Sequence, residues 1–157
     1  MTGLLEILKS ELMVLIMAAT PLIELRGSLP YGIFVLDMNY IHAYIISVLG
    51  SIAPCPFILK FLPNILKGLK GIGIFAGFVD WVTNRANRKS EKVKRYSLWG
   101  LFILVAIPLP GTGVWTGSTI AALLKLPFKS AFIVCLLGTM VAGLLMLILS
   151  HFGLMIL

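Results

Sequence analysis

Residues 98–124, which read LWGLFILVAIPLPGTGVWTGSTIAALL, decide how this chain folds. Two apolar arms, Leu98–Ile107 and Val114–Leu124, flank the proline- and glycine-rich stretch Pro108–Gly113. Each arm has roughly 10–11 residues, or about 16 Å at helical rise, which is half of a ~30 Å hydrocarbon core. Irregular backbone is tolerated at that depth only inside protein. We therefore expect a re-entrant helical hairpin, and a kinked transmembrane helix is the alternative.

A similar broken segment occurs near the N-terminus. The apolar stretch Leu12–Thr20 leads into Pro21–Pro30, which reads PLIELRGSLP, and Tyr31–Leu36 leads out. By contrast, Ile41–Leu62 and Ser130–Leu147 are long enough to cross a bilayer completely. Pro54 and Pro56 are expected to kink the first of these helices.

An internal repeat relates the two broken segments. Residues 43–51 (AYIISVLGS) resemble residues 131–139 (AFIVCLLGT) at an offset of 88, and Pro21 falls on Pro108 with a shift of one residue. Chance similarity between two apolar stretches is the alternative. We interpret the chain as a single membrane domain with two related halves, 1–63 and 98–157, joined by a basic linker, 64–97.

Composition also favours a membrane protein. The chain has 157 residues, of which 59% are hydrophobic and only 12% are charged, whereas roughly a quarter are charged in an average soluble domain. A soluble core of this size does not need so much apolar surface, so the surplus is expected to face lipid. The length leaves no room for an additional soluble catalytic module.

The net charge of +7 is concentrated, which argues against nucleic-acid binding. Nine basic residues lie from Lys60 to Arg95, and Lys125 and Lys129 form a second cluster. If each hairpin returns to the side that it entered from, eleven of the thirteen basic residues share the linker's side. By the positive-inside rule this side is the cytoplasm. The linker itself is expected to form an interfacial helix that meets anionic headgroups, or to serve topology alone.

This topology predicts an all-α integral membrane fold with an inverted repeat of two units. Each unit is a re-entrant hairpin followed by a transmembrane helix, and discontinuous helices that meet near the midplane are typical of transporters. Two full crossings and two hairpins are few helices for a transporter that opens alternately to the two sides of the membrane. We therefore expect a homodimer or larger homo-oligomer.

Glu24 and Arg26 are the most informative residues, because both are charged within an apolar stretch. An intramembrane charge costs at least ~2.5–3.5 kcal/mol on insertion scales, so it is retained for a partner or a function. Arg26 offers a bidentate cation for a phosphate or carboxylate. A carboxyl group removed from water takes up a proton readily, so Glu24 is assigned to proton coupling. The alternative is a structural ion pair that holds the hairpin together.

The second broken segment supplies the rest of the expected site. Its glycines permit close backbone approach, its threonines offer hydroxyls, and the helix after the break would point amide N–H groups at an anion. Trp115 packs either beside the substrate or as a wedge between helices. The expected substrate-binding residues are Arg26, Gly27, Pro30, Pro108, Pro110, Gly111, Thr112, Gly113, Trp115, Thr116 and Gly117.

Enzyme chemistry is not expected. His42 and His151 have no second ligand at helical spacing, which argues against a metal site. A GxSxG elbow, a P-loop and a pair of neighbouring carboxylates are all missing from the sequence. No cofactor is predicted, and Cys55 and Cys135 are interpreted as small hydrophobic residues in packed helices.

The two motifs Pro21-x-x-Glu24-x-Arg26-Gly27-x-x-Pro30 and Pro108-x-Pro110-Gly111-Thr112-Gly113-x-Trp115-x-Gly117 resemble those of a known family. Over essentially its whole length the chain resembles the putative small multidrug export protein family of bacteria and archaea. That family is similar in pattern to the DedA/VTT superfamily, whose members have paired re-entrant loops and include undecaprenyl-phosphate translocases and lipid scramblases. The resemblance implies an anionic, phosphate-bearing lipid substrate. The chain is shorter than typical DedA proteins and has glycines where their second loop carries an additional arginine, and this departure implies a different or smaller anion, or a dimer. The resemblance also implies a bacterial or archaeal inner membrane.

We therefore expect a proton- or sodium-coupled membrane transporter that translocates a phosphate-bearing lipid such as undecaprenyl phosphate. One alternative is an exporter of cationic drugs, in which Glu24 would be the substrate carboxylate. The fixed charge of Arg26, two residues away, argues against cationic cargo. A structural membrane subunit is the second alternative.

Overall fold

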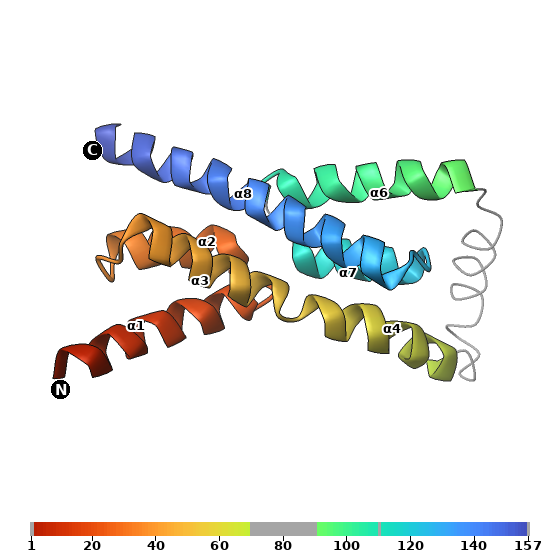
Figure 1. Cartoon of the computed structure of the whole chain (residues 1–157), viewed down its shortest axis with the longest axis horizontal. Coiled ribbons are helices and arrows are strands. Elements are labelled where there is room, and N and C mark those ends of the chain that lie inside the picture. The colour runs from red at the N-terminus through yellow and green to blue at the C-terminus, as the bar shows by residue number, and fades with distance from the viewer. Residues whose placement is uncertain (1, 70–90, 110, 157) are drawn as a thin grey trace.

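The computed structural model describes residues 2–69, 91–109 and 111–156 of the chain (Figure 1). These residues form helices and no strand, which confirms the all-helical expectation. The helices are α1 (Thr2–Ala19), α2 (Glu24–Phe34), α3 (Tyr40–Ile52), α4 (Cys55–Leu69), α6 (Glu91–Ala106), α7 (Val114–Leu123) and α8 (Phe128–Ile156). Most of the basic linker, together with its expected interfacial helix, lies outside the described residues.

Two long apolar rods form the frame of the molecule. Helices α3 and α4 follow each other along one rod, which is apolar over Tyr40–Ile65, and α8 forms the other, apolar over Phe128–Phe152. Both are long enough to cross a membrane. The break between α3 and α4 falls at Ala53-Pro54, where the proline was expected to disturb the helix. The two rods run in opposite directions and contact each other along their length (Figure 1).

Two short helix pairs flank these rods from opposite ends. Helix α1 reaches the middle of the molecule, the chain reverses through residues 20–23, and α2 returns along α1 (Figure 1). Helix α6 reaches the middle from the other end, and α7 returns beside it (Figure 1). With 11 and 10 residues, α2 and α7 are only about 15–17 Å long. The tips of both pairs therefore meet midway along the rods.

The first break is shorter than we expected from the sequence. We expected irregular structure over Pro21–Pro30, but α2 begins at Glu24 and contains Pro30 in its interior. One face of α2 carries Leu25, Leu29 and Ile33 at a spacing of four residues, and all three are buried against α3 and α8. The burial of this apolar face stabilises the helix beyond the cost of the proline.

Equivalent glycines lie at the helix crossings of both halves. A Cβ atom added at Gly50 would lie 2.5 Å from the carbonyl oxygen of Leu15 in α1. A Cβ atom added at Gly138 would lie 3.3 Å from the carbonyl oxygen of Phe102 in α6. The two glycines are 88 residues apart in the sequence, and the two carbonyls are 87 apart. These positions match the sequence repeat and allow close contact of each rod with its flanking helix.

The turns also correspond in the two halves. Glu24 (φ 49°) and Gly111 (φ 80°) have left-handed backbone at the two breaks and are 87 residues apart. Asp37 (φ 49°) and Lys125 (φ 51°) have left-handed backbone in the turns that precede α3 and α8 and are 88 residues apart. Residues other than glycine rarely adopt this conformation, so its occurrence at matching positions is consistent with the sequence repeat.

Large apolar side chains cover the outside of the helices. Ile16, Ile45, Ile103 and Leu144, from four different helices, are each about half exposed. Monomeric soluble proteins rarely expose apolar surface on so many sides. Together with the two long apolar helices, this surface indicates a location in the membrane.

Candidate functional site

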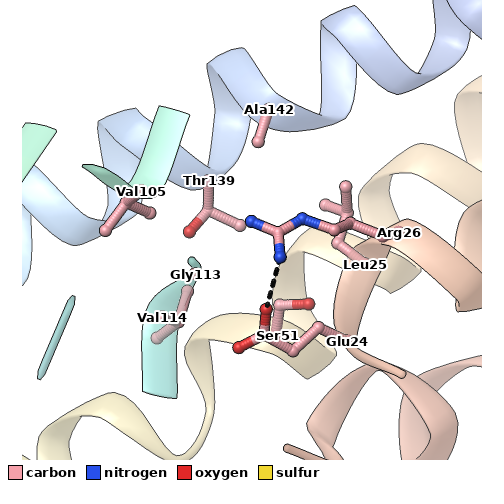
Figure 2. A pocket seen from close by; sticks show the side chains of 9 residues that line it. All are labelled: Glu24, Leu25, Arg26, Ser51, Val105, Gly113, Val114, Thr139 and Ala142. Carbon is pink, nitrogen blue, oxygen red and sulfur yellow. Dashed lines mark ion pairs between the residues drawn. The ribbon is translucent and has the colours of Figure 1, made fainter. Parts of the chain in front are cut away.

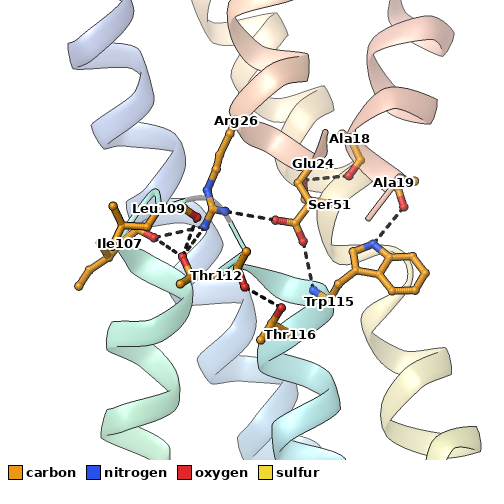
Figure 3. A network of polar contacts seen from close by, with 11 residues as sticks. Ala18, Ala19, Glu24, Arg26, Ser51, Ile107, Leu109, Thr112, Trp115 and Thr116 are labelled. Carbon is orange, nitrogen blue, oxygen red and sulfur yellow. Dashed lines mark hydrogen bonds and ion pairs between the residues drawn. The ribbon is translucent and has the colours of Figure 1, made fainter. Parts of the chain in front are cut away.

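Glu24 connects the tips of the two helix pairs (Figure 3). It is the first residue of α2 and is only 8% exposed. Its Oε1 atom accepts a hydrogen bond of 3.2 Å from the backbone N–H of Trp115 in the first turn of α7. The first N–H groups of a helix have no partner within the helix. The carboxylate from the first half therefore caps a helix of the second half.

Arg26 joins the same two segments. Its Nη1 atom lies 3.9 Å from Oε2 of Glu24. Its Nη2 atom donates hydrogen bonds to Oγ1 of Thr112, at 2.8 Å, and to the carbonyl oxygen of Ile107, at 3.2 Å (Figure 3). The hydroxyl of Thr112 is in turn 2.9 Å from the carbonyl oxygens of Ile107 and Leu109. The guanidinium thus helps to satisfy backbone groups that the second break leaves without helical partners.

Trp115 lies between helices. Its Nε1–H group donates a hydrogen bond of 3.2 Å to the carbonyl oxygen of Ala19, the last residue of α1 (Figure 3). Thr116, the next residue, donates from its hydroxyl to the carbonyl oxygen of Gly111 at 2.9 Å. The indole therefore joins the start of α7 to the end of α1.

A groove opens where the tips meet. It encloses about 420 Å³ and carries the guanidinium of Arg26 beside the hydroxyls of Thr112 and Thr116. Apolar residues of the turn between α1 and α2 form the rim of the groove, and Leu22 in this turn is 97% exposed. The lining residues are Pro21, Leu22, Ile23, Glu24, Arg26, Gly27, Gly111, Thr112 and Thr116.

A small cavity lies next to the same ion pair (Figure 2). Its volume of about 10 Å³ has room for about one water molecule. Glu24 and Arg26 line this cavity as well as the groove, so the ion pair lies between them. The other lining residues are Leu25, Ser51, Val105, Gly113, Val114, Thr139 and Ala142.

Two glycines of the second motif permit close packing at the site. A Cβ atom at Gly113 would overlap the carboxylate of Glu24, so only glycine lets the start of α7 approach it. A Cβ atom at Gly117 would lie 2.5 Å from a side-chain methyl of Val105, so Gly117 serves the contact between α7 and α6. Both glycines therefore position α7.

The structure brings most of the expected residues together, but not all. Glu24, Arg26, Gly27, Gly111, Thr112 and Thr116 line the groove. Pro30 lies inside α2, away from both hollows, and Pro108 lies half-buried in the second break. Pro110 lies outside the described residues.

Two hydroxyl residues next to the site were not among the expected ones. Ser51 and Thr139 come from the two long rods, line the small cavity and are buried. Ser51 donates to the carbonyl oxygen of Ala18, and Thr139 donates to that of Cys135. They are 88 residues apart and follow the crossing glycines, so the sequence repeat contained a signal for both.

A larger hollow lies near the N-terminal half of the molecule. It encloses about 550 Å³ and is lined by the carboxylates of Glu6, Glu11 and Asp37 together with His42. His42 Nδ1 lies 3.7 Å from Oε1 of Glu11. The turn that carries Lys125 lies at the opposite end of the molecule (Figure 1). The two ends of the molecule therefore differ in charge.

Glu24 and Arg26 are the two charged residues that line the groove or the small cavity in the described part of the chain. Both hollows therefore present one carboxylate and one guanidinium beside hydroxyl groups, which belong to Thr112 and Thr116 in the groove and to Ser51 and Thr139 in the cavity.

Comparison with protein families gives one match. The sequence model described as "Putative small multi-drug export protein" matches residues 24–145, which begin at Glu24 and include both halves of the site. This match covers well over half of the chain and confirms the family that the two motifs indicated. No curated protein and no solved structure matches the chain.

Proposed function

We propose that this chain, which belongs to the putative small multi-drug export protein family, is a membrane transporter whose substrate carries a phosphate group. The family description suggests transport in general terms, and an exporter rather than an enzyme. The phosphate-bearing substrate, such as undecaprenyl phosphate, and coupling to protons or sodium are our proposal.

The proposed membrane arrangement is an inverted repeat. In it, α3–α4 and α8 cross the bilayer, and the pairs α1–α2 and α6–α7 are re-entrant hairpins that meet near the midplane. Support comes from the opposite directions of the two pairs and from the matching glycines and left-handed turns (Figure 1). The described ends of the basic linker, residues 64–69 and 91–97, lie at the same end of the molecule as the turn between α7 and α8, which carries Lys125 (Figure 1), and we assign this end to the cytoplasm of a bacterial or archaeal inner membrane.

The observation that carries the substrate proposal is the mixed chemistry of the groove. Arg26 can hold a phosphate, because a guanidinium presents several N–H donors in a plane, and the hydroxyls of Thr112 and Thr116 could join it by turning away from the backbone carbonyls to which they donate. Leu22 at the rim is almost completely exposed, and in the proposed arrangement it would lie at the level where the bilayer is most apolar. An apolar rim would not contribute to the binding of a soluble anion. A lipid would place its headgroup at Arg26 and its chain along Leu22.

Glu24 is the proposed coupling residue. Its carboxylate is buried next to Arg26, and the groove reaches both residues. A buried acid with a single cation nearby is a suitable proton carrier, since changes at the cation alter the stability of its charge. Sodium coupling would use the same carboxylate as a ligand.

Export of cationic compounds is the second candidate, and the family description favours it. Within the described part of the chain, Glu24 supplies the one carboxylate that lines the groove, and it already contacts Arg26 and the N–H group of Trp115. A cation would have to enter beside the fixed charge of Arg26, which would repel it. A purely structural role remains the third candidate, and ordinary activity after neutralisation of both Glu24 and Arg26 would favour it.

The test is native mass spectrometry of the purified protein, scored for co-bound phospholipid or polyprenyl phosphate. Wild type is compared with Arg26→Ala and with Lys60→Ala, a control that removes one exposed positive charge away from the groove. We expect wild type and Lys60→Ala to retain a phosphate lipid and Arg26→Ala to lose it. Equal lipid in all three proteins, or none in any, would count against the proposal. The same spectra test the proposed homodimer by mass.

A further inference from the structure

The Glu24 carboxylate lies where a substrate anion would be most stable. It bridges the guanidinium of Arg26, at 3.9 Å, and the backbone N–H of Trp115, at 3.2 Å. A phosphate bound at Arg26 would need the same positive surroundings. We propose that the Glu24 carboxylate and the substrate headgroup are alternative occupants of this one site, so that Glu24 takes up one proton from solution for each anion bound. This inference rests on the proposed function.

The geometry leaves little room for both anions at once. The Nη2 atom of Arg26 is engaged by Thr112 and Ile107, so Nε and the Nη1 side, which faces Glu24, are left for an anion. The backbone of Gly113 packs directly on the carboxylate. The cavity beside the pair holds about 10 Å³, enough for one water but not for a phosphate. A headgroup that enters from the groove and binds the Nη1 side of Arg26 therefore takes the place of the carboxylate.

Charge balance requires the proton. In the substrate-free state the negative charge of Glu24 balances the positive charge of Arg26. When an anion with one negative charge binds Arg26, a displaced carboxylate would be left in a site with little water and without a cation, which is strongly unfavourable. Protonation of its oxygen restores neutrality. Both states of the site then carry no net charge, as a site near the bilayer midplane requires.

Glu24 is the group in the described part of the chain that can take this proton. The elements packed around it contribute Ser51, Val105, Gly113, Val114, Thr139 and Ala142 to the cavity. None of these side chains titrates in the physiological range. Arg26 keeps its proton under all ordinary conditions. The carboxylates and His42 of the larger hollow do not line this cavity or the groove.

The experiment measures binding of phosphatidylglycerol, a phosphodiester lipid with one fixed negative charge, to the full chain in neutral detergent between about pH 5 and about pH 8. The proteins are wild type, Glu24→Gln, Arg26→Ala and the control Glu11→Gln, which neutralises a carboxylate of the larger hollow. Inorganic phosphate and undecaprenyl phosphate are compared as further probes. A pH-indicator dye in weak buffer counts the protons taken up per lipid bound.

We expect the affinity of wild type and of Glu11→Gln to fall up to about tenfold per pH unit once Glu24 is ionised, with up to about one proton taken up per lipid. Glu24→Gln should lose the pH dependence and the proton uptake, and it should bind more tightly than wild type at about pH 8. Arg26→Ala should not bind at any pH. Binding of inorganic phosphate as tight as that of the lipids would identify a soluble anion as the substrate.

The possible failures are distinct. Unchanged pH dependence in Glu24→Gln, or binding to wild type at about pH 8 without proton uptake, would overturn the competition between the two anions while leaving Arg26 as the anion site. Binding by Arg26→Ala equal to wild type, or no binding of any probe by wild type, would instead overturn the proposed function. The proton count uses wild-type protein, so it decides the inference even if Glu24→Gln fails to fold.

Discussion

Replacement of Gly113 by alanine tests the contact that joins the two halves. The backbone of Gly113 is extended (φ 165°), so alanine fits the conformation, but its Cβ atom would overlap the Glu24 carboxylate. The side chain of Glu24 would have to turn away and would lose its hydrogen bond to the N–H of Trp115. A hydrogen bond to a charged group contributes about 1.5–3 kcal/mol. We therefore expect Gly113→Ala to destabilise the protein by about 2 kcal/mol.

A double-mutant cycle isolates this cost. In a Glu24→Ala background the carboxylate is gone, so Gly113→Ala should cost less than about 0.5 kcal/mol. Thermal unfolding in detergent is monitored by size-exclusion chromatography, which gives the midpoint temperature of each of the four proteins in the cycle. For a protein of this size about 2 kcal/mol corresponds to a shift of about 4–8 °C. Gly100→Ala is the control, because a Cβ atom there meets nothing within 4 Å. The same loss of stability in both backgrounds would refute the contact.

Three further predictions use the same protein. Gly50→Ala and Gly138→Ala should each cost about 1–3 kcal/mol, because the added Cβ atoms press on neighbouring helices, and unchanged midpoints would contradict the crossings. Trp115→Phe removes the hydrogen bond to Ala19 and should lower the free energy of unfolding by about 1 kcal/mol. A midpoint equal to that of wild type would show that the bond contributes nothing. A membrane-impermeant maleimide should label Asn39→Cys in intact cells but Lys129→Cys only after lysis. Cys55 and Cys135 are buried and should stay unlabelled, and labelling of both introduced cysteines from the same side would exclude the inverted arrangement.

The sequence was sufficient to locate the main interruptions of the helices. Pro54 lies at the break between α3 and α4. The helix is also interrupted in the second broken segment, and α7 begins after it at Val114, as the proline and glycine content of the segment predicted. These features are local, because proline and glycine change the backbone preferences of their immediate neighbours. The first broken segment was harder to predict. Its proline at position 30 lies inside α2, since burial against α3 and α8 outweighs the local preference.

The candidate site was only partly accessible from the sequence. Glu24 and Arg26 were identifiable because a charge in an apolar stretch needs an explanation. Their hydrogen-bond partners were not, because Trp115 is 91 residues from Glu24 and Thr112 is 86 residues from Arg26. The start of α7 was expected to face a substrate anion, and in the structure it carries the carboxylate of Glu24.

Composition, breaks and charge clusters therefore sufficed to predict a helical membrane protein, and they predict two related halves. These properties follow from local backbone preferences and from the cost of charge in lipid, both of which act residue by residue. Only the tertiary structure decided that the two tips meet, that Glu24 caps α7 and that Arg26 lies between a groove and a cavity. These contacts depend on how the two rods pack and on the close approach that Gly50, Gly113 and Gly138 permit, and such geometry is set by the whole fold.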